Sequence, residues 1–252
     1  MGGGDDYYFG IEGTFDGQGY EIHDLFINRP DKNDVGLFGY VDDSGVIKNI
    51  GVMNVTVIAN AAVGGLVGYS SGIVSNSYSS GNVTGYEAVG GLAGTNGYGI
   101  VSNSYSTGSV IGNRWVGGLV GWHADIVSNS YSSCNVTGYQ CVGGLVGYNY
   151  GHDGTVSNSY SAGSVSGNSS VGGLVGWTHY AVVSGSFWDT ETSGQATSDG
   201  GTGKNTMEMQ DIITFSDVGW NVTAVALNET NPAYIWNIVN NVTYPFLSWE
   251  SI

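Results

Sequence analysis

Short runs of alternating apolar and polar residues fill most of the chain and recur at a fixed spacing. The run Val-Gly-Gly-Leu-Val-Gly occupies residues 63–68 and returns, once with Ala for Val, at residues 89–94, 116–121, 142–147 and 171–176. Two further runs, at residues 74–79 and 81–85 in the first unit, return with the same spacing. None of these runs is long enough or helix-periodic enough for a helix, so each unit predicts three strands of roughly 4–6 residues.

A single unit of this kind cannot bury its apolar face, whereas a stack of identical units buries a continuous core. With a degenerate copy at residues 35–39, the pattern predicts an all-β fold, a parallel β-helix (β-solenoid) of about six coils of 26–29 residues. Parallel crossovers are nearly always right-handed, so we expect that hand. The expected parts are an N-terminal cap or first coil at residues 1–34, repeats at 35–186, and a C-terminal cap at 187–252 that closes the open end.

Alternation in the second run predicts which side chains face the core. Val74, Asn76 and Tyr78 would point inward, and the equivalent residues of the other coils would stack on them in columns. The serines at positions 75, 77 and 79 would point outward and form a regular hydroxyl surface with their equivalents. Such a surface is compatible with ice binding or O-glycosylation, and more simply with a soluble face of low charge.

Charge and hydropathy exclude two classes of partner. Five Lys and Arg residues stand against 21 Asp and Glu, a formal net charge of −16, which leaves no basic surface for nucleic acid or anionic lipid. No stretch approaches the roughly 20 apolar residues of a membrane span, so direct membrane insertion is not expected. Only 10% of residues are charged, and the abundance of Gly, Asn, Ser and Thr favours an extracellular protein.

Extracellular chains are often modified at sequons and cysteines. Seven Asn-x-Ser/Thr sequons are candidate N-glycosylation sites. They begin at Asn54, Asn82, Asn135, Asn168, Asn221, Asn228 and Asn241. Cys134 and Cys141 form either a short-loop disulfide or a pair of free, partly buried thiols, and the sequence leaves both alternatives open.

Signals for catalysis are weak. Residues 51–180 contain three acidic residues and a single basic residue, Arg114, which argues against a polysaccharide-active groove built on paired carboxylates. We therefore expect no catalytic residues and no enzyme activity.

Two acidic pairs near the N-terminus are weak candidate ligands of a structural calcium ion, because calcium prefers clustered oxygen ligands. They are Asp5, Asp6, Asp42 and Asp43. No other cofactor is expected. His123, His152 and His179 follow the glycine-rich run at different offsets, so they do not predict a transition-metal site.

An aromatic residue follows the glycine-rich run in four units. These residues are Tyr69, Trp122, Tyr148 and Trp177, and the unit that begins at Val89 has Thr95 in their place. Two roles remain open for this column: stacking on sugar rings, or sealing the corner of the core.

The repeats resemble the GLUG repeat of large secreted and surface-anchored proteins of bacteria and archaea. The resemblance rests on the three runs at residues 63–69, 74–79 and 81–85 and their copies, and it covers nearly the whole chain. It implies a β-solenoid with an adhesin-like or surface-layer role, and it implies no catalytic residues.

Together these features predict a non-enzymatic, extracellular structural or adhesive module at a prokaryotic cell surface, with an archaeal one favoured. Its partners would be other copies of the chain, assembled into a fibre, sheath or layer, or other surface proteins and glycans. The main alternative is a rod that displays glycan-binding aromatic residues. Ice binding and polysaccharide chemistry are weaker alternatives.

Overall fold

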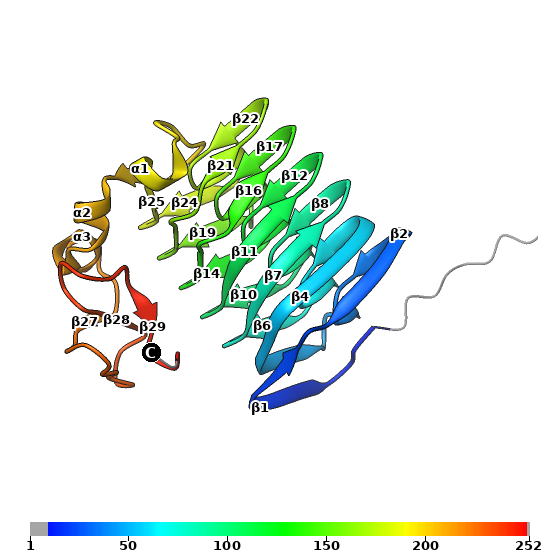
Figure 1. Cartoon of the computed structure of the whole chain (residues 1–252), viewed down its shortest axis with the longest axis horizontal. Helices are drawn as coiled ribbons and strands as arrows, with labels where there is room; N and C mark the ends of the chain where they lie inside the picture. Colours follow the sequence, from blue (N-terminus) through cyan, green and yellow to red (C-terminus); the bar gives the residue numbers. More distant parts are fainter. Residues whose placement is uncertain (1–9, 251–252) are drawn as a thin grey trace, which may run out of the picture.

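Parallel strands stacked coil upon coil form the body of the protein (Figure 1). This computed structural model describes residues 10–250. Strands at one position of a coil pair in parallel register with those at the same position of the next coil, as Val101 does with Val74 and Val127. The predicted all-β parallel solenoid of about six coils is thereby confirmed.

Four strand positions, rather than the expected three, make up a coil, because the glycine-rich run bends at its Gly pair and supplies two of them. The position after the Gly pair contains β3 (Phe38–Val41), β5 (Val67–Ser70), β9 (Ala93–Asn96), β13 (Val120–His123), β18 (Val146–Tyr150) and β23 (Val175–His179). The position before it contains β8 (Glu87–Gly90), β12 (Arg114–Gly117), β17 (Gln140–Gly143) and β22 (Ser169–Gly172).

The other two positions come from the second and third runs. One contains β6 (Ile73–Ser75), β10 (Ile100–Ser102), β14 (Ile126–Ser128), β19 (Thr155–Ser157) and β24 (Val182–Ser184). The next contains β7 (Tyr78–Thr84), β11 (Tyr105–Ile111), β15 (Tyr131–Ser132), β16 (Asn135–Thr137), β20 (Tyr160–Ser161), β21 (Val165–Ser166), β25 (Phe187–Asp189) and β26 (Thr202–Lys204). In the first coils, β1 (Thr14–His23) and β2 (Phe26–Val35) both pair with the long β4 (Val46–Gly64).

Close approach of successive coils explains the glycines of the first run. A Cβ added to Gly118 would lie 2.1 Å from both the carbonyl oxygen of Gly144 and Oγ of Ser132, distances at which neighbouring atoms would have to shift. The φ angle of Gly118 is not positive, so the need for glycine here comes from space and not from a left-handed backbone. The interior of the coils is filled mainly by Val and Leu side chains, such as Leu119, which is fully buried.

The prediction of which side chains face the core was wrong from Asn76 onward in the second run. Asn76 has φ of 47°, and its equivalents Asn103, Asn129 and Asn158 have φ of 47–48°. A left-handed residue turns the chain and breaks the two-residue alternation. Ser77 and Ser79 therefore lie buried, at 0% and 1% exposure, while Tyr78 lies on the outside of the coil. The continuous outward hydroxyl surface on which the ice-binding hypothesis depended is consequently absent.

The buried serines form a hydrogen-bonded ladder along the solenoid. Ser104 Oγ donates to the carbonyl oxygen of Ser102 at 2.7 Å and accepts from the backbone N–H of Ser77, one coil earlier, at 3.2 Å. The same two bonds recur at Ser130, Ser159 and Ser186. Each hydroxyl thus satisfies a backbone N–H at a corner, where the strand ladder provides no acceptor.

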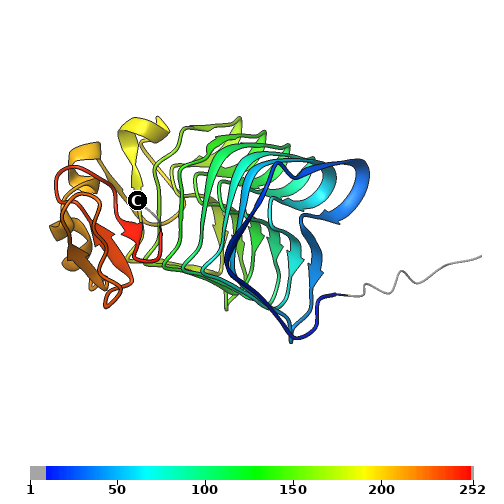
Figure 2. The same ribbon diagram turned by 60° about the horizontal axis from the view of Figure 1, so that its bottom comes forward.

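The C-terminal segment has two parts. Its first part stacks on the last coil: β25 pairs with β20, β26 pairs with β25, and Gly173 N–H donates to the Thr197 carbonyl. Its second part contains α2 (Thr206–Met209), α3 (Ile212–Ser216), β27 (Val222–Ala224), β28 (Trp236–Ile238) and β29 (Phe246–Leu247), and α1 (Thr190–Ser193) precedes it. This second part packs against the outer tyrosines of the coils, around a separate core that contains Phe215 and Trp236 (Figure 2).

Removing one ladder hydroxyl tests the role of the buried serines. We expect Ser104→Ala to lower the free energy of unfolding by about 1–3 kcal/mol, because it leaves the buried Ser77 N–H without an acceptor. Ser102→Ala, two residues away and with no side-chain hydrogen bond in the structure, should change it by less than about 0.5 kcal/mol. Thermal and denaturant unfolding of both variants gives the comparison, and equal losses would contradict the ladder.

Candidate functional site

The aromatic column predicted from the sequence lies on the sheet of β3, β5, β9, β13, β18 and β23. Trp122 pairs in register with Thr95 and Tyr148, and Tyr148 pairs with Trp177. The Tyr148 and Trp177 rings stack at 5.0 Å between centroids with 12° between their planes. Exposure rises along this pair, from 9% at Tyr148 to 41% at Trp177. Tyr148 is therefore packed into the surface of the sheet, whereas the ring of Trp177 is open to solvent.

Two further aromatic residues extend this surface. Tyr40 stacks on Tyr69 at 5.1 Å, and Tyr150 stacks on Trp122 at 6.0 Å and on His179 at 5.8 Å. The sequence contained a signal for Tyr40, which follows the degenerate copy at residues 35–39 as Tyr69 follows the first full copy. Tyr150 lies three residues after the glycine-rich run that ends at Gly147. The residue at this position differs in every repeat, so no repeat pattern predicts it.

The three histidines that follow the glycine-rich run do not form one site. His123 is fully buried, where its Nδ1 lies 3.2 Å from Asn96 Nδ2 and its Nε2 lies 3.2 Å from the Thr155 carbonyl oxygen. Burial lowers the pKa of His123 to about 4, so the ring is neutral at pH 7. In register, His123 pairs with Asn149, whereas His179 pairs with Tyr150.

Of the calcium candidates, Asp42 and Asp43 have no additional acidic partner among the described residues. Asp42 Oδ1 accepts from the Asp43 backbone N–H at 2.7 Å, in the turn between β3 and β4. Within residues 10–250, no group of three or more His, Cys, Asp or Glu side chains is placed to hold a metal ion. Asp5 and Asp6 lie outside the described residues.

The cysteines are free in the structure, so the candidate disulfide is not formed. Cys134 and Cys141 are both buried, and Cys134 belongs to the core of the solenoid. They lie before β16 and within β17, two different strand positions of one coil. Burial raises the pKa of the Cys134 thiol to about 11, so it stays protonated at neutral pH.

The seven sequon asparagines all lie exposed on the surface. Asn82 and Asn135 occupy the same position of coils two apart, with Ser109 between them. Side-chain accessibility is what attachment of a glycan requires, and occupancy of these sites remains a prediction.

A column of outer tyrosines forms a second aromatic surface, which the C-terminal segment partly covers. Tyr78, Tyr105, Tyr131 and Tyr160 stack with ring centroids 4.8–5.0 Å apart. The C-terminal segment covers the later tyrosines most completely, and the Tyr160 hydroxyl donates to the Pro245 carbonyl oxygen at 2.6 Å. Trp249 reaches the earlier ones, at 5.8 Å from the ring of Tyr105.

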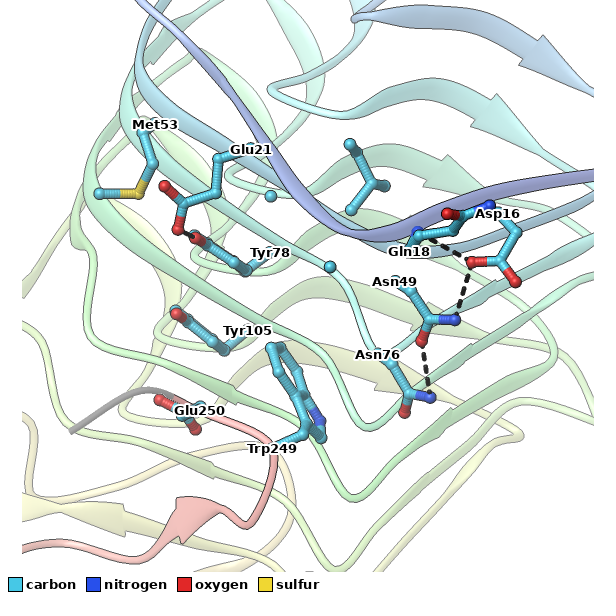
Figure 3. Close-up of a pocket in the computed structure, with 13 residues that line it drawn as sticks. Asp16, Gln18, Glu21, Asn49, Met53, Asn76, Tyr78, Tyr105, Trp249 and Glu250 are labelled. Atoms are coloured by element: carbon cyan, nitrogen blue, oxygen red, sulfur yellow. Dashed lines mark hydrogen bonds between the residues drawn. The ribbon is translucent and has the colours of Figure 1, made fainter. Parts of the chain in front are cut away.

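A cavity of about 600 Å³ lies where this C-terminal end meets the first coil (Figure 3). Tyr78, Tyr105 and Trp249 form its aromatic wall, and carboxylates come from β1 and from the end of the chain. Those carboxylates belong to Asp16, Glu21 and Glu250. The sequence showed only that both ends of the chain are acidic. It gave no sign that they meet.

Hydrogen bonds fix the polar side chains of this cavity. Asp16 Oδ1 accepts from Asn49 Nδ2 at 3.0 Å, and Asn49 Oδ1 accepts from Asn76 Nδ2 at 3.3 Å (Figure 3). The Tyr78 hydroxyl donates to Glu21 Oε1. Lys48 Nζ lies 3.3 Å from the other oxygen of Asp16.

Three of the repeats match the model of the GLUG motif, at residues 59–84, 85–111 and 138–166. The chain contains GLUG repeats. The coil between the second and third matches has the same register as its neighbours, through pairs such as Val116 with Val89 and Val142. The GLUG solenoid thus continues through the unit that lies between these matches.

Two curated relatives share part of this GLUG chain. Halomucin of Haloquadratum walsbyi is 42% identical over 83 residues, which is 33% of this chain and 1% of halomucin. A candidate Gly-rich membrane protein of Evansella cellulosilytica is 41% identical over 69 residues, which is 26% of this chain and 8% of that protein. The chain therefore spans only a small part of either relative. Within residues 10–250, no helix is both long enough and apolar enough to span a bilayer.

A solved structure resembles the GLUG solenoid over most of its length. It is a candidate immunoglobulin A1 protease of Bacteroides ovatus, with a TM-score of 0.54 and 19% sequence identity, and the match covers 94% of this chain and 77% of that one. At this identity the likeness shows the fold alone.

Glu250 links the cavity to the tyrosine column and makes the GLUG chain sensitive to pH. Its carboxyl accepts from the Tyr131 hydroxyl at 2.8 Å and from the Leu247 backbone N–H at 2.6 Å. Burial outweighs these two bonds and raises the pKa of Glu250 from 4.5 to about 7. The stability that this carboxyl contributes is therefore present below pH 4.5 and is lost as the pH rises through about 7.

We expect Glu250→Gln to match the wild type in stability near pH 4.5 and to exceed it at pH 8. The gain at pH 8 should approach about 3 kcal/mol, because each pKa unit is worth about 1.4 kcal/mol. Unfolding curves from pH 4.5 to 8 measure the difference in the free energy of unfolding between the two proteins. His123 is present in both, so its opposite pH dependence cancels in this difference. Glu229→Gln, on an exposed loop, is the matched control, and a pH-independent difference would contradict the assignment.

Proposed function

We propose that this GLUG solenoid is a non-enzymatic structural and adhesive module of a longer cell-surface protein. Its registered coils form a stiff support, and the aromatic column on β13, β18 and β23 contacts glycans. The observation that carries the proposal is the Tyr148–Trp177 stack, which leaves the Trp177 ring 41% exposed on a nearly uncharged sheet. A ring exposed on a rigid sheet can stack on the apolar face of a sugar at little entropic cost.

The similarity to halomucin and to a Gly-rich membrane protein supports a location at the cell surface, and a prokaryotic source. The seven exposed sequons and the low content of charged residues agree with this location. The candidate protease from Bacteroides ovatus shares the fold only, at 19% identity. Solenoids of this shape therefore carry different functions, and the proposal depends on the surface residues of this chain.

Replacement of Trp177 tests the glycan-binding surface. On an array of neutral oligosaccharides, we expect Trp177→Ala to weaken binding about tenfold, which corresponds to roughly 1.4 kcal/mol of lost stacking. Tyr139→Ala removes an aromatic residue that is more exposed than Trp177 and lies at another position of the coil, so this variant should bind like the wild type. Equal binding by all three proteins, or no binding by the wild type, would reject this role for the column.

Self-association is a second candidate function, and the first coil favours it. Among residues 10–250, β1 and β2 pair on one side only, with β4, and their other edge faces outward. The same coil exposes Tyr20 at 74% and Phe26 at 67%. An open strand edge with exposed aromatic residues is a template for pairing with another chain.

Electron microscopy over a concentration series tests this association. We expect rods of about twice the single-chain length to become more frequent as the concentration of the protein rises, because two copies pair through the open edges of their first coils. Phe26→Lys should shift the onset to about tenfold higher concentration, since a charge on an edge strand opposes pairing. Tyr98→Lys, on an exposed loop in the middle of the solenoid, is the control. Rods of one length at every concentration would exclude end-to-end assembly.

A further inference from the structure

The cavity between the first coil and the C-terminal end is separate from the aromatic column and has a different chemistry. Its lining combines three aromatic rings with three carboxylates, and no Lys, Arg or His side chain lines it. The volume of about 600 Å³ lies within the range of small-molecule sites. Aromatic faces and carboxylates both attract cations, and low-dielectric walls concentrate the resulting field.

Three successive tyrosines of the column differ in what their hydroxyl groups contact. The Tyr78 hydroxyl donates to Glu21, and the Tyr131 hydroxyl donates to Glu250 at 2.8 Å. Tyr105 lies between them, 4.8 Å from the ring of Tyr78 and 4.9 Å from that of Tyr131. Its hydroxyl has no hydrogen-bond partner among the described residues. A gap flanked by two carboxylates and backed by a free hydroxyl oxygen thus opens at Tyr105 (Figure 3).

The field at this gap is negative. Burial raises the pKa of Tyr105, and the carboxylates of Glu250 and Glu21 raise it further. The third carboxylate is already neutralised, because Lys48 lies 3.3 Å from Asp16. The exposed His23 contacts one oxygen of Glu21 at 2.9 Å and does not line the cavity. Glu21 and Glu250 are therefore the groups that a ligand meets, and a bound cation favours the charged form of Glu250, whose pKa lies at about 7 in the free protein.

We propose that this cavity binds a ligand with a protonated amine on an apolar body, such as an amino sugar or a polyamine. The ammonium group occupies the gap at Tyr105, where it donates to Glu21, to Glu250 and to the tyrosine hydroxyl oxygen. The apolar body lies against the Trp249 ring, which is 37% exposed. A metal ion would use the carboxylates but not the aromatic wall, whereas an organic cation uses both.

A matched pair of probes separates charge from sugar shape. Isothermal titration of the wild-type chain compares a glucosamine disaccharide with its N-acetylated form, at a pH where the free amines are protonated. The two have the same ring skeleton, and only the first carries ammonium groups. We expect the amine form to bind at least about tenfold more tightly. Spermidine, titrated in parallel, shows whether an amine without a sugar ring suffices, and calcium chloride shows whether a metal ion alone binds.

Two substitutions locate the binding site within the cavity. Tyr105→Phe retains the stacked ring and breaks no hydrogen bond of the free protein, so it should fold normally and bind the amine about threefold to tenfold more weakly. Glu21→Gln should weaken binding about tenfold, because it removes one flanking charge. Tyr86→Phe and Glu229→Gln, both exposed and outside the cavity, are the matched controls.

The outcomes distinguish this proposal from the glycan-binding function of the aromatic column. Equal or tighter binding of the N-acetylated disaccharide, binding of calcium but of no amine, or no binding at all would each overturn the amine site. Amine affinity unchanged by both substitutions would also overturn it. Trp177→Ala should leave amine binding intact, so failure of one site is visible independently of the other.

Discussion

The hydrogen-bonded spacing between parallel coils is the constraint on which this structure depends. Because each residue pairs with the residue at the same position of the next coil, every side chain stacks on its own counterpart. The ring spacing of 4.8–5.0 Å in the tyrosine column is this backbone spacing transmitted to side chains. A position therefore favours residues that are compatible with the residue at the same position of the next coil. Glycine at Gly118 and serine at Ser104 meet that condition in opposite ways, by the absence of a side chain and by a hydroxyl that both donates and accepts.

The same constraint explains how much of the fold the sequence predicted. Repeat spacing alone placed Trp122, Tyr148 and Trp177 in one column, and the register of the strands agrees. The direction of side chains failed at Asn76, because the two-residue rule holds only for extended backbone and Asn76 is left-handed. Asn tolerates that conformation better than most residues, so its recurrence in the middle of the second run was an available signal for a corner. A corner at Asn76 predicts that Ser77 points inside and Tyr78 outside.

The cavity could not be derived in this way, because it lies outside the repeats. Glu21 comes from the first coil and Glu250 from the end of the chain, and they share one cavity because the C-terminal segment packs along the outer tyrosines. That packing depends on apolar residues such as Trp236 and Phe215, whose spacing follows no repeat. Composition predicted that this segment packs onto the solenoid, yet nothing in its pattern distinguished the open end of the solenoid from its side.

The acidic residues lie mainly at the two ends of the sequence and not in the repeats. Residues 1–50 contain ten of the 21 acidic residues and residues 181–252 contain eight, so the repeats between them are almost uncharged. Where the two ends meet at the tyrosine column, Glu21 and Glu250 line one cavity, whereas the strands of the sheet that carries Trp177 contain no Asp, Glu, Lys or Arg. Neutral aromatic surfaces suit stacking on uncharged sugars, and acidic aromatic cavities suit cations. The two proposed functions thus place two kinds of recognition on one solenoid, and each proposed ligand is selected by its charge before its shape.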